Sequence, residues 1–260
     1  MTTRIAKRRS GALWTLGLGA LLCAFGSTAA EAGVVITQEV TKADGTGKTT
    51  TDPSTVMIEG NRMKMISPEG TMIFDLDKSS MIVLNEPAKT ATEVTLSSVG
   101  DLAAGAYSGD FKPTGRKRTV AGYPCEEYKH EFKTLGGEVS TVSCISKEAP
   151  GAEEAAAFYR RMAEKVAKGK AGSPPKGIAL AEEADIKPTK LEMPGLPPEM
   201  AKQIAQAQSK QMPKKSKVVV TSVKTQALGP EVFAAPAGFE VKKMEIPQTP
   251  ATIEPMDHHH

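Results

Sequence analysis

Two short segments have residue types and spacings that resemble sites for phosphate and for calcium. The first, GTGKTT at 45–50, matches the end of a phosphate-binding P-loop, but Lys42 stands where the motif needs its first glycine. A P-loop also needs a following helix whose N-terminus holds the phosphate. The residues from Thr49 onward, TTTDPS, resist helix formation. We therefore interpret 45–50 as a hairpin turn.

The second segment, DLDKSSMIVLNE at 75–86, places oxygen-bearing side chains at calcium-loop positions 1, 3, 5 and 12: Asp75, Asp77, Ser79 and Glu86. Position 6 should be glycine for the sharp bend of the loop and is Ser80. The flanking residues alternate as strands do, whereas an EF-hand loop lies between helices. A β-turn with acidic ends is the ordinary interpretation, and the sequence predicts no metal site.

A catalytic histidine or a zinc site would depend on His130, the only histidine before His258–His260. Neither GxSxG nor HExxH accompanies it. His130 lies in an alternating charged segment, and we expect it to face solvent. The sequence thus predicts no catalytic residue, no cofactor and a non-enzymatic protein.

Residues 1–32 have the three parts of a secretory signal peptide. A basic start precedes the apolar segment 11–25, and Ala30-Glu31-Ala32 forms a small-x-small cleavage site. The apolar segment is shorter than the roughly 20 residues that a membrane span needs. We predict a mature chain from Gly33, a periplasmic or secreted location, and no stable membrane span after cleavage. Cys23 would allow lipidation, but Leu22 stands where lipoprotein signals have a small residue.

Charge argues against a nucleic-acid partner. Without the leader, Lys plus Arg falls from 33 to 29 and Asp plus Glu from 30 to 29, so the mature chain is nearly neutral. Proteins that bind nucleic acid carry a basic face that pairs with phosphates. The sequence therefore predicts no nucleic-acid binding.

Two cysteines remain after the leader, Cys125 and Cys144, and in an exported chain such a pair predicts a disulfide. Closing this loop should stabilise the fold by roughly 3 kcal/mol in the chain-entropy model. They lie in two extended segments on either side of Gly136-Gly137. A two-residue turn there would place Cys125 opposite Glu148. Either the loop is longer and centred nearer Thr134, or a bulge shifts the pairing.

The remaining pattern predicts short antiparallel strands with turn signals every eight to ten residues. Extended segments are expected at 33–41, 54–59, 62–66, 71–76, 80–85, 90–96, 114–120, 178–186, 217–226, 233–239 and 241–246. A Gly-, Ala- and Ser-rich loop at 97–119 leads into the cysteine region. The strongest helix is 152–168, with an apolar stripe of Ala155, Phe158 or Tyr159, Met162 and Val166. A weaker helix is expected at 197–211.

Methionine is concentrated in the first half of this pattern, at Met57, Met63, Met65, Met72 and Met81. Methionine is flexible and fills irregular apolar space, and it is also common on adaptable binding surfaces. One interpretation is ordinary core filling. The other is an apolar groove that accepts acyl chains, with these five residues as groove candidates. The mature chain lacks tryptophan, which gives no support to stacking on sugars or bases.

Three segments occur in a characteristic order: TGRKRTVAGYPCEEY at 114–128, KGIALAE at 176–182 and VFAAPAGFEVKK at 232–243. With the second cysteine and a helix between the first two, the chain resembles a bacterial exported domain-of-unknown-function family related to the outer-membrane lipoprotein carrier (LolA/LolB-like) fold. The resemblance covers about 33–244. It implies a curved antiparallel sheet with helices over its concave face, a periplasmic location and an apolar ligand. It supplies no catalytic residues.

The predicted fold class is mainly β (α+β). We expect one antiparallel half-barrel domain at 33–246 with two covering helices, and a disordered tail at 247–260. Strand pairing around 97–119 and 187–213 stays open. The predicted function is that of an exported non-enzymatic protein that binds a lipid or other apolar ligand in a groove of the curved sheet. The alternative is a structural or interaction module of the cell envelope, with a packed core and a protein partner.

Overall fold

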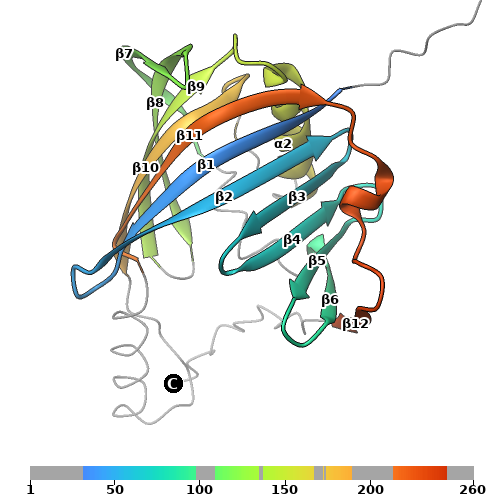
Figure 1. The fold of residues 1–260 in the computed structure, drawn as a ribbon. Coiled ribbons are helices and arrows are strands. Elements are labelled where there is room, and N and C mark those ends of the chain that lie inside the picture. The colour runs from blue at the N-terminus through green and yellow to red at the C-terminus, as the bar shows by residue number, and fades with distance from the viewer. Residues whose placement is uncertain are drawn as a thin grey trace, which may run out of the picture. The chain divides into compact units, whose positions relative to one another are not determined.

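The computed structural model describes residues 32–97, 109–134, 137–166, 172, 174–188 and 213–244 (Figure 1). The predicted signal peptide up to residue 31, the weaker helix at 197–211 and the tail at 247–260 lie outside these residues. The described strands are β1 (Gly33–Ala43), β2 (Thr49–Glu59), β3 (Arg62–Ser67), β4 (Gly70–Asp75), β5 (Ser80–Asn85), β6 (Thr90–Thr95), β7 (Lys112–Val120), β8 (Tyr123–Thr134), β9 (Gly137–Ser146), β10 (Ile178–Pro188), β11 (Lys215–Gln226) and β12 (Glu240–Met244).

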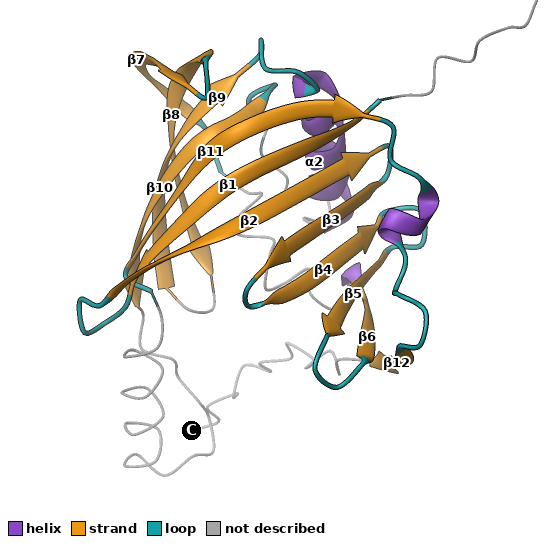
Figure 2. Cartoon of the chain, viewed as in Figure 1, coloured by secondary structure: helices purple, strands orange, loops and turns teal. Residues whose placement is uncertain are grey.

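These strands form one sheet in the order β12-β6-β5-β4-β3-β2-β1-β11-β10-β9-β8-β7. Two meanders, β1 to β6 and β7 to β11, join side by side. At the junction β1 pairs with β11 through eleven residue pairs, from Gly33 with Gln226 to Ala43 with Lys215. The edge strands β7 and β12 stand at opposite ends of the order, so the sheet is open. Figure 2 shows the long strands β1, β2 and β11 bending across the middle of the sheet.

The sheet is mixed, which corrects the prediction of wholly antiparallel pairing. β12 pairs in parallel with β6, whereas the other neighbouring strands pair antiparallel. β11 lies beside β1 and β12 lies at the far edge, so the chain between them must cross the sheet. The crossing contains the 3-10 turn η2 (Pro230–Phe233). The predicted extended segment at 233–239 is therefore a crossover without strand pairing.

One complete α-helix, α2 (Ala152–Val166), lies within the described residues. Its predicted stripe is confirmed, because Ala155, Phe158, Met162 and Val166 are buried. The helix packs against β1, β2 and β10. At its start, Gly151 has a φ of +72°, and a Cβ there would lie 2.6 Å from the Cβ of Val34. Glycine therefore permits both the turn and the close approach to β1.

Across β1 to β6, the two faces of the sheet pack in two separate apolar clusters. Cross-strand partners lie on the same face, and the register gives one face two rows of partners: Val34, Ile58, Met63, Phe74 and Met81 in one row, and Ile36, Val56, Met65 and Met72 in the other. We call this the α2 face, since members of these rows pack with α2. The opposite side, where Leu228 and Phe233 pack on Ile73 and Leu84, is the η2 face.

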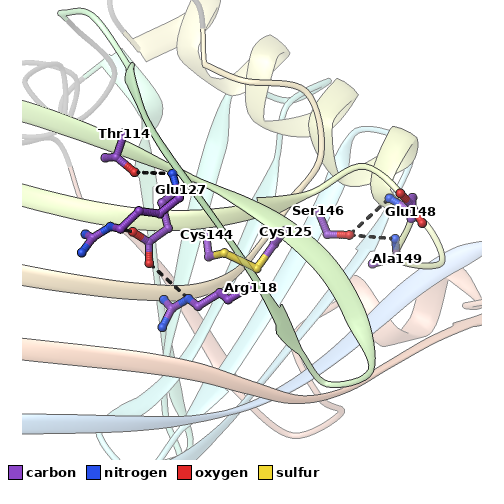
Figure 3. The surroundings of a disulfide bond; sticks show 9 residues. Thr114, Arg118, Cys125, Glu127, Cys144, Ser146, Glu148 and Ala149 are labelled. Atoms are coloured by element: carbon purple, nitrogen blue, oxygen red, sulfur yellow. Dashed lines mark hydrogen bonds and ion pairs between the residues drawn. A yellow bond between two sulfur atoms is a disulfide. The ribbon is translucent and has the colours of Figure 1, made fainter.

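Cys125 and Cys144 are joined in a disulfide, with Cα atoms 5.3 Å apart (Figure 3). Thr134 pairs with Gly137, so the turn lies one residue earlier than Gly136-Gly137 and nearer Thr134. No register shift interrupts the described pairs of β8 and β9, and Cys144 stands opposite Glu127. The disulfide therefore joins positions that are offset along the two strands, and no bulge is needed.

Glu127 is buried beside the disulfide and has two cationic partners from β7. The Nε atom of Arg116 lies 2.7 Å from its Oε2 atom, and the Nε atom of Arg118 lies 3.3 Å from its Oε1 atom. In Figure 3 the side chains of Arg118 and Glu127 lie near the disulfide. Two guanidinium groups thus compensate one buried carboxylate at this end of the sheet.

Candidate functional site

A cavity of about 420 Å³ lies between the α2 face and the helix. The strands β1, β2, β3, β9, β10 and β11 contribute its walls, α2 and the segment 174–177 line its other side, and it is open to solvent. Its apolar lining includes Ile36, Val56, Met65, Ile145, Ala156, Tyr159, Pro174, Pro175, Ile178 and Val218. Pockets that hold small molecules have volumes of about 300–1,000 Å³ and are lined mostly by apolar side chains.

Three polar side chains also line the cavity: Gln38, Ser143 and Glu182. The register pairs Ser143 of β9 with Glu182 of β10, so these two side chains lie on one face. The Ser143 hydroxyl donates a hydrogen bond of 2.8 Å to the Oε2 atom of Glu182. The cavity therefore has apolar walls and one polar wall, and the polar wall carries a carboxylate.

The space arises from the way α2 is attached. Near the start of the helix, the Oε1 atom of Glu154 accepts the Gly60 N–H at 2.5 Å, and Arg161 donates to the Gly60 carbonyl at 2.7 Å. These bonds hold the helix to the β2–β3 turn. Ala156 and Tyr159 point toward the cavity on another side of the helix. A small side chain at 156 leaves volume that a larger one would fill.

The structure brings four of the five candidate methionines onto the α2 face. Met65 lines the cavity. Met63 is buried in the α2-face cluster and Met81 packs against it, and Met72 is the cross-strand partner of Met65. Met57 lies on the η2 face instead, packed against the cluster of Leu228 and Phe233. Met57 lies between Val56 and Ile58, which face α2. Because side chains alternate along a strand, Met57 points to the opposite face of the sheet.

His130 does not face solvent, which corrects the sequence-based prediction. It is 3% exposed, and its ring stacks between Phe111 and Phe132 with centroid distances of 4.1 and 4.9 Å. Phe132 is two residues along the same strand, whereas Phe111 comes from the segment before β7. The charged neighbours of His130 in the sequence, Lys129 and Glu131, lie on the other face of β8. Their charges therefore do not indicate the environment of His130. His130 lies in an aromatic stack that borders the cavity through Phe111.

The phosphate-like segment is the hairpin turn between β1 and β2. The Oδ1 atom of Asp44 accepts the hydroxyl of Thr46 at 2.6 Å and the N–H groups of Thr46 and Lys48 at 2.8 and 3.0 Å. The hydroxyl bond from Thr46, followed by the backbone bonds, lowers the pKa of the Asp44 carboxyl despite some desolvation. The Asp44 carboxylate thus stabilises the hairpin turn itself, as the sequence-based interpretation of 45–50 as a turn expects.

The calcium-like segment is the turn between β4 and β5. Asp75 accepts the Lys78 N–H at 3.0 Å and pairs with its amine at 3.1 Å. Burial acts to raise the pKa of Asp75, but the bonds and charge of Lys78 hold it below its usual value. Glu86 follows the far end of β5, away from Asp75. Within the described ranges, no group of three His, Cys, Asp or Glu side chains could hold a metal ion.

Sequence reasoning did not identify Glu182, Ser143 or Phe111 as site residues, and it named Tyr159 only as an alternative to Phe158 in the apolar stripe of the helix. One signal existed for Glu182, since it is an acidic residue at the end of the apolar run from Ile178. The next residue, Glu183, is acidic too, and the register shift between 179 and 181 decides which of them faces the cavity. That shift has no marker in the sequence.

Across the part of the chain that the structure describes, no helix is long and apolar enough to cross a membrane.

No protein-family model and no curated protein matches this chain. Among solved structures, PNGF-II is similar with a TM-score of 0.42 and 12% identity over 82% of this chain, which spans only 31% of the PNGF-II chain. A LolA superfamily protein from Nitrosomonas europaea has a TM-score of 0.33 and 10% identity, covering 78% of this chain and 90% of that one. A DUF1329 family protein from Desulfovibrio piger has a TM-score of 0.34 and 7% identity, covering 80% and 91%. Similarities of this size do not extend to function.

Proposed function

We propose that this chain is an exported, non-enzymatic protein that binds a lipid or another apolar ligand in the cavity between α2 and the sheet. The observation that carries the proposal is the cavity itself, about 420 Å³ of space with a mainly apolar lining. The secretory pattern of the first 32 residues and the disulfide support an exported, periplasmic location.

An apolar occupant would gain from this lining because each Å² of apolar surface removed from water contributes roughly 25 cal/mol. Met65 and Tyr159 suit such an occupant, since one is flexible and the other offers a broad apolar ring. The alternative, an envelope module with a protein partner, predicts a fully packed core. The volume beneath α2 favours a ligand over that alternative.

The test is a titration of delipidated protein with N-phenyl-1-naphthylamine, an uncharged apolar dye whose fluorescence rises in apolar surroundings. We expect saturable uptake by the wild-type chain. Met65→Glu should weaken uptake by about tenfold or more, because a charge would stand in the apolar lining. Wild-type protein without saturable uptake would contradict the proposed function.

Met57→Glu is the matched control. Met57 and Met65 are both half-buried methionines of neighbouring strands, but they lie on opposite faces. Dye affinity should stay within about twofold of the wild type in the folded Met57→Glu variant, since its charge is outside the cavity. Equal loss in both variants would show that the dye does not report on this cavity.

A further inference from the structure

Glu182 is the only charged side chain among the described residues that line the cavity. It is partly buried, and the other described side chains that line the cavity are mainly apolar apart from Ser143 and Gln38. Its Oε2 atom accepts the Ser143 hydroxyl at 2.8 Å. A serine hydroxyl is a neutral donor and leaves the negative charge of the carboxylate uncompensated.

The neighbouring acidic residues of β10, Glu183 and Asp185, form ion pairs with lysines. Glu183, on the opposite face, lies 3.0 Å from the amine of Lys217, and Asp185 lies 3.4 Å from the amine of Lys215. Both pairs are exposed. Within the described part of the chain, no lysine or arginine forms an ion pair with Glu182. The outward carboxylates of β10 are thus paired with lysines, whereas the carboxylate of Glu182 lines the cavity.

We propose that the cavity selects single-chain amphiphiles with a protonated amine head group over those with a carboxylate. This inference rests on the proposed function. The apolar walls would hold the hydrocarbon chain, and the amine would donate to Glu182. A hydrogen bond between charged partners is about twice as strong as a neutral one. An anionic head would instead place two negative charges together in a partly buried site, which is unfavourable.

The experiment compares decylamine, decanol and decanoate as competitors of the uncharged dye at about pH 7, where the amine is protonated and the carboxylate ionised. Wild-type protein should bind them in the order decylamine, decanol, decanoate. Decylamine should bind about tenfold or more tightly than decanoate, as expected for a hydrogen bond between charged groups. The three compounds share one chain length, so the order reports on the head group.

Glu182→Gln removes the charge and keeps the shape. It should reduce the difference between decylamine and decanoate to about twofold. Glu183→Gln is the control on the same strand, and the wild-type order should persist. Ser143→Ala provides a second variant: it removes the hydroxyl from Glu182, and the preference for decylamine should remain or grow.

The outcomes separate this inference from the proposed function. If the dye and decanol bind but wild-type protein takes decanoate as well as decylamine, head-group selection is wrong and the apolar cavity stands. The same conclusion follows if Glu182→Gln keeps the full preference for decylamine. If neither the dye nor any decyl compound binds wild-type protein, the proposed function fails, and head-group selection fails with it.

Discussion

The α2 face and the η2 face of the same sheet are covered by chain segments of different kinds. On the α2 face, a helix of 15 residues stands over long strands and leaves a cavity beneath one of its sides. On the η2 face, a crossover packs Leu228 and Phe233 directly on the strands. Both coverings bury apolar side chains, and beneath the first lies a volume of about 420 Å³ that suits a ligand.

The polar contacts of the two coverings explain part of the difference. The crossover is held at the sheet by the Leu228 N–H, which donates to the Oε1 atom of Glu59 at 2.9 Å, and by the Arg62 guanidinium, which lies 4.9 Å from the ring centre of Phe233. The helix is held at several points along its length: Glu154 and Arg161 bond to Gly60, and the Lys165 amine donates to the Ser79 hydroxyl at 3.1 Å. A straight helix does not follow the curve of the sheet, whereas an irregular crossover can.

The largest expected effect on stability separates the two clusters. Phe158→Ala should destabilise the protein by about 3–5 kcal/mol, because Phe158 is fully buried between the helix and the sheet. Phe233→Ala should cost less, about 2 kcal/mol, because the turn around it can close over the gap. Urea unfolding of both variants measures the difference. Equal losses would mean that the crossover is packed as rigidly as the helix.

A smaller effect is expected from the disulfide, whose two cysteines are both buried. Replacing both, as Cys125→Ser with Cys144→Ser, should lower the free energy of unfolding by roughly 3 kcal/mol in the chain-entropy model. The single variants should be close to the double variant, since each already lacks the bond. If the double variant is as stable as oxidised wild type, the bond adds nothing to this end of the sheet.

Much of the sheet was predictable from short strand-forming segments between turn signals. Ser80–Asn85 was predicted with the bounds that the structure has, and β3 and β6 differ by one residue. Residues 81–84 of β5 are all apolar, because Met81 packs on one cluster and Ile82 and Leu84 pack on the other. The apolar stripe of α2 was equally visible, since it repeats at helical spacing.

The features that failed depend on contacts between distant segments. His130 is buried because Phe111, which lies just before β7, stacks on its ring. The parallel pairing of β12 follows from the path of the crossover. The inward direction of Glu182 follows from a register shift in β10. None of these features leaves a periodic pattern in the sequence, so the polar wall of the cavity was not predicted. The methionine-lined groove for an apolar ligand stays a prediction.

Methionine methyl groups provide the most direct test of the central claim, that the cavity under α2 holds the ligand. Four of the five methionines in β2 to β5 lie on the α2 face, and Met57 lies on the other. The measurement is a titration of delipidated protein carrying ¹³C-methyl methionine with decanol, followed by NMR and assigned by single substitutions. The account predicts the largest shift at Met65 and no shift at Met57. Shifts at Met57 as large as those at Met65, or none at any methionine of the α2 face, would contradict it.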